Sequence, residues 1–177
     1  STSRRQRQMC IRDRSTDLDA QGKPVVKYVM WTHSFIPTAD KLREHIIKDK
    51  MPYDAWERLG YLTLTNTPIV DQNFVMKYIL DECEKYNLDI QCLCFDPANA
   101  SKIMMDLSDQ GYTVEEVFQS HKSLNESTQG FREQVFAGNV AYTHNPLLNY
   151  AMSNAVIRTN NGLIKICLLY TSDAADD

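Results

Sequence analysis

The sequence lacks the features that mark several large classes of protein. No run of eighteen apolar residues occurs among its 177 residues, so the sequence predicts no transmembrane helix. None of its five cysteines forms a C-x-x-C pair or lies at a spacing from histidine that suits zinc. Glycine-rich phosphate loops of the G-x-x-x-x-G-K-[ST] and G-x-G-x-x-G types are absent, as is the G-x-S-x-G nucleophile elbow. Nucleotide binding and serine-hydrolase chemistry therefore have no support.

Charge of either sign is not concentrated into a stripe. The whole chain carries 19 basic and 23 acidic residues, for a net charge of −4. Leaving out residues 1–15 and 167–177 removes five arginines and four aspartates, which changes the net charge to −5. This balance argues against a dedicated nucleic-acid-binding module, but it is compatible with an enzyme that touches nucleic acid only at a metal site.

The two ends differ in character from the interior. Residues 1–15 are basic, non-periodic and nearly free of apolar residues, and they lack the apolar centre of a signal peptide. Residues 167–177 read CLLYTSDAADD. Both strings resemble translated sequencing-adapter sequence, so we expect them to be non-native segments outside a single domain over residues 16–166. The alternative is a disordered basic arm and a disordered acidic tail.

Between these ends, predicted strands alternate with predicted helices. Strand signals cover residues 25–35, 61–65, 88–96 and 112–118, and Asn160-Asn161-Gly162 predicts a hairpin between 155–158 and 163–166. Helix signals begin at Thr38 and Pro52 and cover residues 72–87, 97–110, 127–137 and 146–154. This order predicts an α/β fold, a mixed sheet with helices on both faces.

Asp96 is the most distinctive polar residue of this pattern. It is the only carboxylate predicted to stand directly after a strongly apolar strand, and ligands of α/β sheets bind beyond the carboxyl ends of strands. Two roles compete for it: the cap of a helix starting at Pro97, or a metal ligand or acid–base group. The motif alone favours the cap. Cys92 and Cys94 on the same strand, like Cys83 on the preceding helix, are expected to be reduced, buried thiols of a cytosolic protein.

The loop of residues 119–123 is a weaker candidate. It follows a predicted strand end, so Gln119, His121 and Lys122 could share a face with Asp96 and contact a substrate. A solvated loop is the alternative. Trp31 and Trp56 are expected to be core or interface anchors.

Several short motifs, in this order and spacing, resemble the nuclease domain of the large terminase subunit of tailed bacteriophages. The motifs are Phe35-Ile36-Pro37, Pro52-Tyr53-Asp54-Ala55-Trp56 followed by Gly60, the CFDPANA string of residues 94–100, Gly111-Tyr112, Gln119, and residues 145–148 running on to Met152-Ser153-Asn154. The resemblance implies an RNase H-like fold and metal-dependent endonucleolytic cleavage of double-stranded DNA during genome packaging. It further implies Mg²⁺ or Mn²⁺ in a two-metal site, phage DNA, a portal protein and a small terminase subunit as partners, and the host cell cytoplasm as location.

By position, Asp96 matches the second acidic residue of that family, which favours the metal-ligand role. The first belongs on an opening strand where residues 1–15 stand, and the third on a helix beyond Ile166. We therefore expect a domain that lacks its first strand and last helix, leaves the strand of residues 25–35 short of a neighbour, and is inactive. The alternatives are a non-catalytic α/β interaction module, with Trp31, Tyr53 and Trp56 as exposed anchors, and another RNase H-like enzyme such as a resolvase or integrase core.

Overall fold

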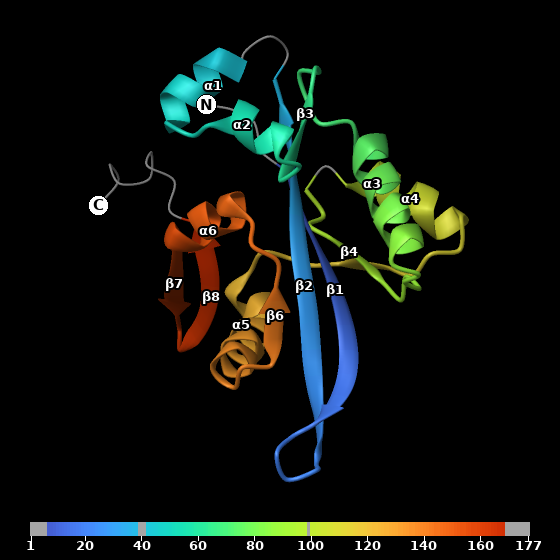
Figure 1. The fold of residues 1–177 in the computed structure, drawn as a ribbon, viewed down its shortest axis with the longest axis vertical. Helices are drawn as coiled ribbons and strands as arrows, with labels where there is room; N and C mark the ends of the chain where they lie inside the picture. The colour runs from blue at the N-terminus through green and yellow to red at the C-terminus, as the bar shows by residue number, and fades with distance from the viewer. Residues whose placement is uncertain (1–6, 39–41, 99, 169–177) are drawn as a thin grey trace. The chain divides into compact units, whose positions relative to one another are not determined.

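The computed structural model describes residues 7–38, 42–98 and 100–168 (Figure 1). The chain divides into two compact units, residues 1–79 with 138–151 and residues 80–137 with 152–177. Helix α3 (Gln72–Lys85) and helix α6 (Pro146–Ser153) each cross a boundary between them. Within the described ranges, no helix is long and apolar enough to cross a membrane.

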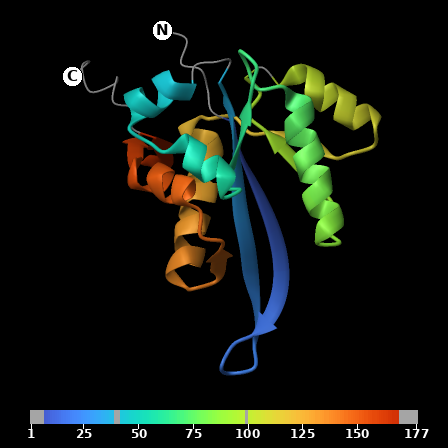
Figure 2. The ribbon, with the colours of Figure 1, turned by 45° about the horizontal axis from the view of Figure 1, so that its top comes forward.

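The first unit is built on a long antiparallel hairpin, the blue two-stranded ribbon of Figures 1 and 2. Strand β1 (Arg7–Leu18) pairs with strand β2 (Pro24–Pro37) along its whole length, from Arg7 opposite Phe35 to Leu18 opposite Pro24. One oxygen of Asp19 accepts hydrogen bonds from the backbone N–H groups of Gln21 (2.9 Å) and Lys23 (2.8 Å) and so organises the turn. The expectation that β2 is short of a neighbour is therefore wrong.

The other edge of β2 pairs with two separate strands. Strand β3 (Leu62–Thr65) runs parallel to residues 34–37, and strand β6 (Val140–Tyr142) runs parallel to residues 28–30. Residues 31–33 of β2 have no strand beside them on that edge. The buried side chain of Asn145 fills this gap, because its Nδ2 donates to the carbonyl of Thr32 at 3.0 Å. These four strands form one mixed sheet.

Two helices pack over the core of this unit. Helix α1 is described over Leu42–Asp49, and the expected start after Thr38 falls on residues 39–41, outside the described residues. The hydroxyl of Thr38 donates to the carbonyl of Thr65. Helix α2 (Tyr53–Arg58) starts after Pro52, as expected. The core contains Ile36, Tyr53, Leu62 and Leu147, with Trp56 packed against it.

The second unit contains a short parallel pair. Strand β4 (Leu93–Phe95) pairs with strand β5 (Val114–Glu116), and helix α4 (Ser101–Asp109) connects them. Both strands are shorter than expected. Leu88 does not extend β4, because its N–H donates to the carbonyl of Cys83 on α3 at 2.8 Å. Asn87, just before it, takes the left-handed conformation (φ 51°) that often follows a helix end.

A helix and a hairpin complete the second unit. Helix α5 (His121–Phe136) starts six residues before the expected position, because Ser120 caps it by accepting the N–H of Ser123 at 3.1 Å. Strands β7 (Ala155–Asn160) and β8 (Leu163–Leu168) form the expected hairpin. The oxygen of Asn125 on α5 accepts the N–H of Ile164 on β8 at 2.9 Å and ties the two together. Cys167 and Leu168 belong to β8, whereas the expected domain ended at residue 166.

The cysteines correct one further expectation. Cys83 is buried on α3, as expected, but Cys92 and Cys94 are exposed. The mixed sheet of β1, β2, β3 and β6 lies in the first unit, and the β4–β5 pair belongs to the second.

Candidate functional site

The carboxyl ends of β4 and β5 lie side by side because the two strands are parallel. The N–H of Val117 donates to the carbonyl of Phe95 at 2.7 Å and extends the pairing one residue past β5. Asp96 follows β4 directly, and Gln119 and Ser120 follow β5. Ligands of α/β folds bind at such an edge, so the structure places the sequence-derived candidates where a ligand is expected.

Asp96 is exposed, and its carboxylate is only partly engaged. Its Oδ1 accepts the N–H of Ala98 at 3.0 Å, which forms a tight side-chain-to-backbone turn. This carboxylate does not cap α4, because that helix begins at Ser101 and its N-cap, Ala100, makes no side-chain hydrogen bond. Among the described residues, none donates a hydrogen bond to Oδ2.

The residues after β5 are held by an interaction that the sequence did not indicate. The Lys165 Nζ, from β8, donates to the backbone carbonyl of Gln119 at 2.9 Å. The Gln119 side chain makes only a long contact, with its Nε2 3.4 Å from the carbonyl of Val117. A lysine inside an ordinary hairpin strand carries no motif, so only the fold could identify Lys165.

His121 and Lys122 are the first residues of α5 and do not lie in a loop. Lys122 is exposed, whereas the Nε2 of His121 is enclosed and has no hydrogen-bond partner in the described part of the chain. Neither residue, nor Gln119, hydrogen-bonds to Asp96. The structure thus brings Asp96 and Gln119 to one edge without joining them.

Glu115 is a carboxylate on β5, the strand that pairs with β4. The register places it opposite Cys94, two residues before Asp96, and it is exposed. Partial desolvation raises the pKa of the neighbouring Cys92 thiol; the hydrogen bond to Cys94 and the charges of Cys94 and Glu115 raise it further. Glu115 therefore lies near Cys92, at the other end of β4 from Asp96. The period of two along the strand is the only sequence signal that could have identified it.

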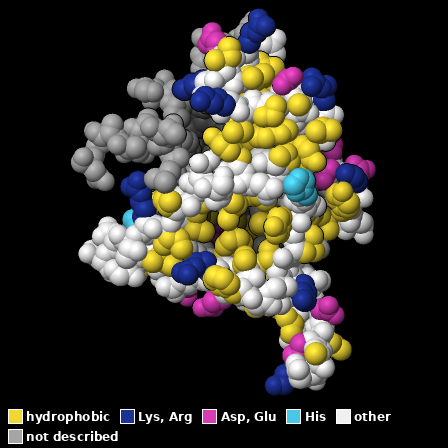
Figure 3. Space-filling model, turned by 60° about the vertical axis from the view of Figure 1, so that its left-hand side comes forward, with side chains coloured by type: hydrophobic (Ala, Val, Ile, Leu, Met, Phe, Trp, Pro, Cys, Tyr) yellow, Lys and Arg dark blue, Asp and Glu magenta, His cyan; other side chains and the backbone are white. Residues whose placement is uncertain are grey.

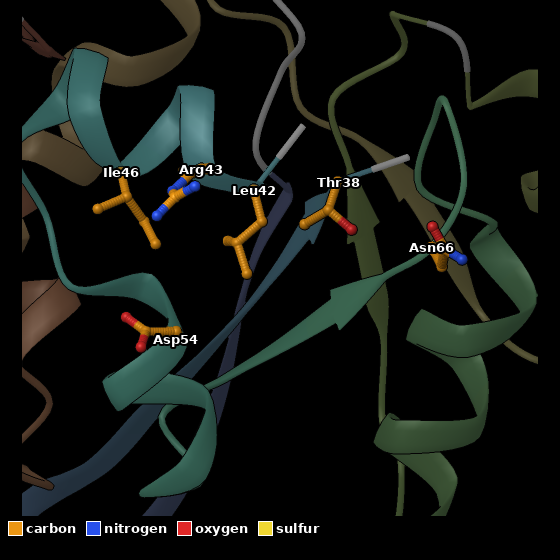
Figure 4. A pocket seen from close by; sticks show the side chains of 6 residues that line it. All are labelled: Thr38, Leu42, Arg43, Ile46, Asp54 and Asn66. Atoms are coloured by element: carbon orange, nitrogen blue, oxygen red, sulfur yellow. The ribbon is translucent and has the colours of Figure 1, made fainter. Parts of the chain in front are cut away.

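A different hollow lies beyond the carboxyl ends of β2 and β3 in the first unit. Figure 4 shows its lining, with a volume of about 570 Å³: Thr38, Leu42, Arg43, Ile46, Asp54 and Asn66. Its one carboxylate, Asp54, is already paired with Arg58 at 3.2 Å. The hollow holds no second acid or nucleophile among these six residues, so it carries less chemistry than the edge at Asp96.

The described residues on the face shown in Figure 3 form no extended basic track. On the face shown in Figure 3, Lys and Arg side chains lie singly or in small groups, separated by polar and hydrophobic side chains and accompanied by Asp and Glu. Any recognition of a polyanion by this face rests on few cations.

Comparison of folds defines the class of the protein. The chain is similar to the crystal structure of the HK97 bacteriophage large terminase, with a TM-score of 0.68 and 21% sequence identity. The match covers 93% of this chain and 35% of that terminase, so the chain spans about a third of its length. The fold is therefore the α/β, RNase H-like fold of a terminase nuclease domain.

The sequence itself identifies the family. Residues 23–174 match the model of the terminase large subunit, endonuclease domain. The chain belongs to this family, and the resemblance inferred from its motifs is confirmed. No curated protein sequence matches the chain.

Proposed function

We propose that this domain serves the endonucleolytic cleavage of double-stranded DNA by a full-length phage terminase during genome packaging, with Asp96 as a ligand of Mg²⁺ or Mn²⁺. The observation that carries the proposal is the Asp96 carboxylate, which is exposed at the carboxyl end of β4 and bound through one oxygen to the N–H of Ala98. Hard divalent cations favour carboxylate oxygens, so this arrangement suits one ligand position. Family membership supports nuclease chemistry.

The described residues do not complete a metal centre. Within the ranges that the structure describes, no three His, Cys, Asp or Glu side chains converge in a way that could hold an ion. A two-metal site places its ions roughly 3.5–4 Å apart and needs several acidic ligands. Asp96 and Glu115 alone do not fit such a site, so we derive no catalytic step through it. We propose that the isolated chain is inactive.

Residues beyond β5 are the proposed substrate contacts. The exposed ammonium group of Lys122 is suited to a DNA phosphate, which would fix the position of the duplex without reading its sequence. Gln119 contributes an amide, and Lys165 positions it through its backbone carbonyl. His121 is the weakest of the three candidates, because its enclosed Nε2 is turned away from solvent.

Partners and location follow from family membership. We propose phage double-stranded DNA as substrate, a portal protein and a small terminase subunit as partners, and the host cell cytoplasm as the place of action. The alternative of a protein-interaction module is weakened, since Tyr53 is only 4% exposed and Trp56 is half-buried against the core beside it. Tyr53 does not form the exposed anchor that such a module requires.

Plasmid cleavage by the full-length terminase in Mn²⁺ tests the proposal. Asp96→Asn removes the charge but keeps an oxygen that can accept the N–H of Ala98, so the turn should survive. Loss of a metal contact worth several kcal/mol predicts a fall in the cleavage rate of about 100-fold or more. Asp106→Asn, which removes an exposed carboxylate on α4, is the matched control and should cut normally. Full activity of Asp96→Asn would refute the assignment.

A further inference from the structure

Two exposed thiols, one on β4 and one directly before it, lie in contact. The Sγ atoms of Cys92 and Cys94 are 3.9 Å apart, and both residues are exposed. Leu93 between them is buried, so the two cysteines project to the side of the strand opposite its core contact. Cys83, in contrast, is buried on α3. The sequence favoured three buried thiols, and the structure instead separates one enclosed thiol from an accessible pair.

We propose that Cys92 and Cys94 form an oxidation site, which a peroxide converts into a reversible disulfide within the strand. This modification is independent of the proposed nuclease function. Two features distinguish the pair from an ordinary surface cysteine. Each thiol has a second thiol in contact as a resolving partner, and both are accessible to a small oxidant.

The geometry permits the bond but strains it. A disulfide needs its sulfurs about 2.05 Å apart, so they must approach each other by about 1.9 Å. Residues two apart on an extended strand have Cα atoms about 6.6–6.8 Å apart, at the upper end of the range for disulfides. Cys92 lies just outside β4 and is not held in the β4–β5 register, so it can move toward Cys94. A strained, exposed disulfide is readily reduced, which makes the modification reversible.

The reaction balances with hydrogen peroxide as the oxidant. The sulfur of one cysteine attacks a peroxide oxygen, the O–O bond breaks, and a sulfenic acid and one water form. The sulfur of the second cysteine then attacks the sulfenic sulfur, which forms the S–S bond and releases a second water. Two thiols lose two hydrogens and two electrons in total, and the peroxide is reduced to two waters.

Peptide mapping of the native chain tests this proposal directly. Trypsin should release residues 86–102, which contain Cys92 and Cys94 and no other cysteine, and residues 78–85, which contain only Cys83. After a brief peroxide treatment and alkylation of the remaining thiols, the proposal predicts that residues 86–102 lose two hydrogen masses and take up no alkyl group. Dithiothreitol before alkylation should restore two alkylated cysteines. The peptide with Cys83 should stay reduced, because that thiol is enclosed.

Two variants keep the test decisive. Cys92→Ser and Cys94→Ser each leave one exposed thiol, so neither should lose two hydrogen masses, and the remaining cysteine should gain oxygen atoms. Circular dichroism before treatment checks that each variant is folded. Two free thiols in the parent under conditions that oxidise the single-cysteine variants would overturn the proposal. Oxygen addition without an internal disulfide in the parent would overturn it as well.

Discussion

The side-chain amide of Asn145 donates a hydrogen bond to the backbone carbonyl of Thr32, at 3.0 Å and across 113 residues of sequence. It does so on the edge of β2 that faces away from β1, between the segments paired with β6 and β3. The same side chain accepts the N–H of Leu147 at 2.9 Å. One buried amide thus completes the pairing of β2 and fixes the start of α6.

Asn145→Ala should destabilise the first unit. The change leaves the carbonyl of Thr32 and the N–H of Leu147 without their side-chain partner, and Asn145 is only 4% exposed. We expect a loss of roughly 1–3 kcal/mol in the free energy of unfolding, measured by urea denaturation. Asn149→Ala, at an exposed position of α6, is the control and should change it by less than about 0.5 kcal/mol. Equal effects of the two variants would contradict this account.

The buried hydroxyl of Tyr53 should make stability depend on alkaline pH. It donates to Asp49 at 2.9 Å, and burial, followed by this hydrogen bond and the charge of Asp49, raises its pKa well above the usual range. Because the folded pKa exceeds the unfolded value of about 10, the contribution is complete below pH 10 and is lost as pH rises above it. The free energy of unfolding should then fall by up to about 1.4 kcal/mol per pH unit from this group.

Tyr53→Phe isolates that contribution. At pH 7 the variant should lose about 0.5–1.5 kcal/mol with the hydrogen bond, and the gap to the parent should narrow between pH 10 and 11. Tyr142→Phe, at an exposed tyrosine, should run parallel to the parent throughout. Urea unfolding at each pH provides the measurement. A gap that stays constant or widens above pH 10 would show that the hydroxyl does not titrate as inferred.

Asp19 should control the β1–β2 hairpin. Its Oδ1 accepts two backbone N–H groups in the turn, so Asp19→Ala should cost about 1 kcal/mol, as for the loss of a helix cap. Hydrogen exchange should become faster at the backbone amides of β2 that pair with β1. Gln21→Ala keeps the backbone donor to Asp19 and should leave exchange unchanged. If β2 amides exchange rapidly in the parent protein as well, the pairing with β1 is not formed in solution.

Turns and helix caps could be predicted from the sequence, because they depend on a few neighbouring residues. Asn161 and Gly162 take φ values of 47° and 77°, as the two-residue turn between β7 and β8 requires, and this turn was expected from the residues alone. Asp71 likewise caps α3 as expected, by accepting the N–H of Asn73 at 2.9 Å. Family membership, expected from motif order, is confirmed.

Elements that depend on distant partners were not predictable in the same way. Residues 7–18 contain no clear strand pattern, and their extended structure comes from pairing with β2. The apolar run of residues 88–95 predicted a longer strand. The partner strand β5 spans only three residues, and the N–H of Leu88 bonds to the end of α3. For Asp96, the sequence predicted the position and offered a helix cap or a metal ligand. In the structure Asp96 instead accepts the N–H of Ala98 in a turn, which is neither a helix cap nor a metal contact. Its role as a metal ligand stays a proposal.

Binding of Mn²⁺ to this chain, followed by paramagnetic broadening of backbone amide resonances, tests the central role of Asp96 most directly. The account predicts that millimolar Mn²⁺ broadens the amides of Asp96 and Ala98 first. It also predicts that Asp96→Asn abolishes this broadening, and that Asp106→Asn retains it. Identical broadening near residue 96 in the parent and in Asp96→Asn would contradict the assignment of this carboxylate as a metal ligand.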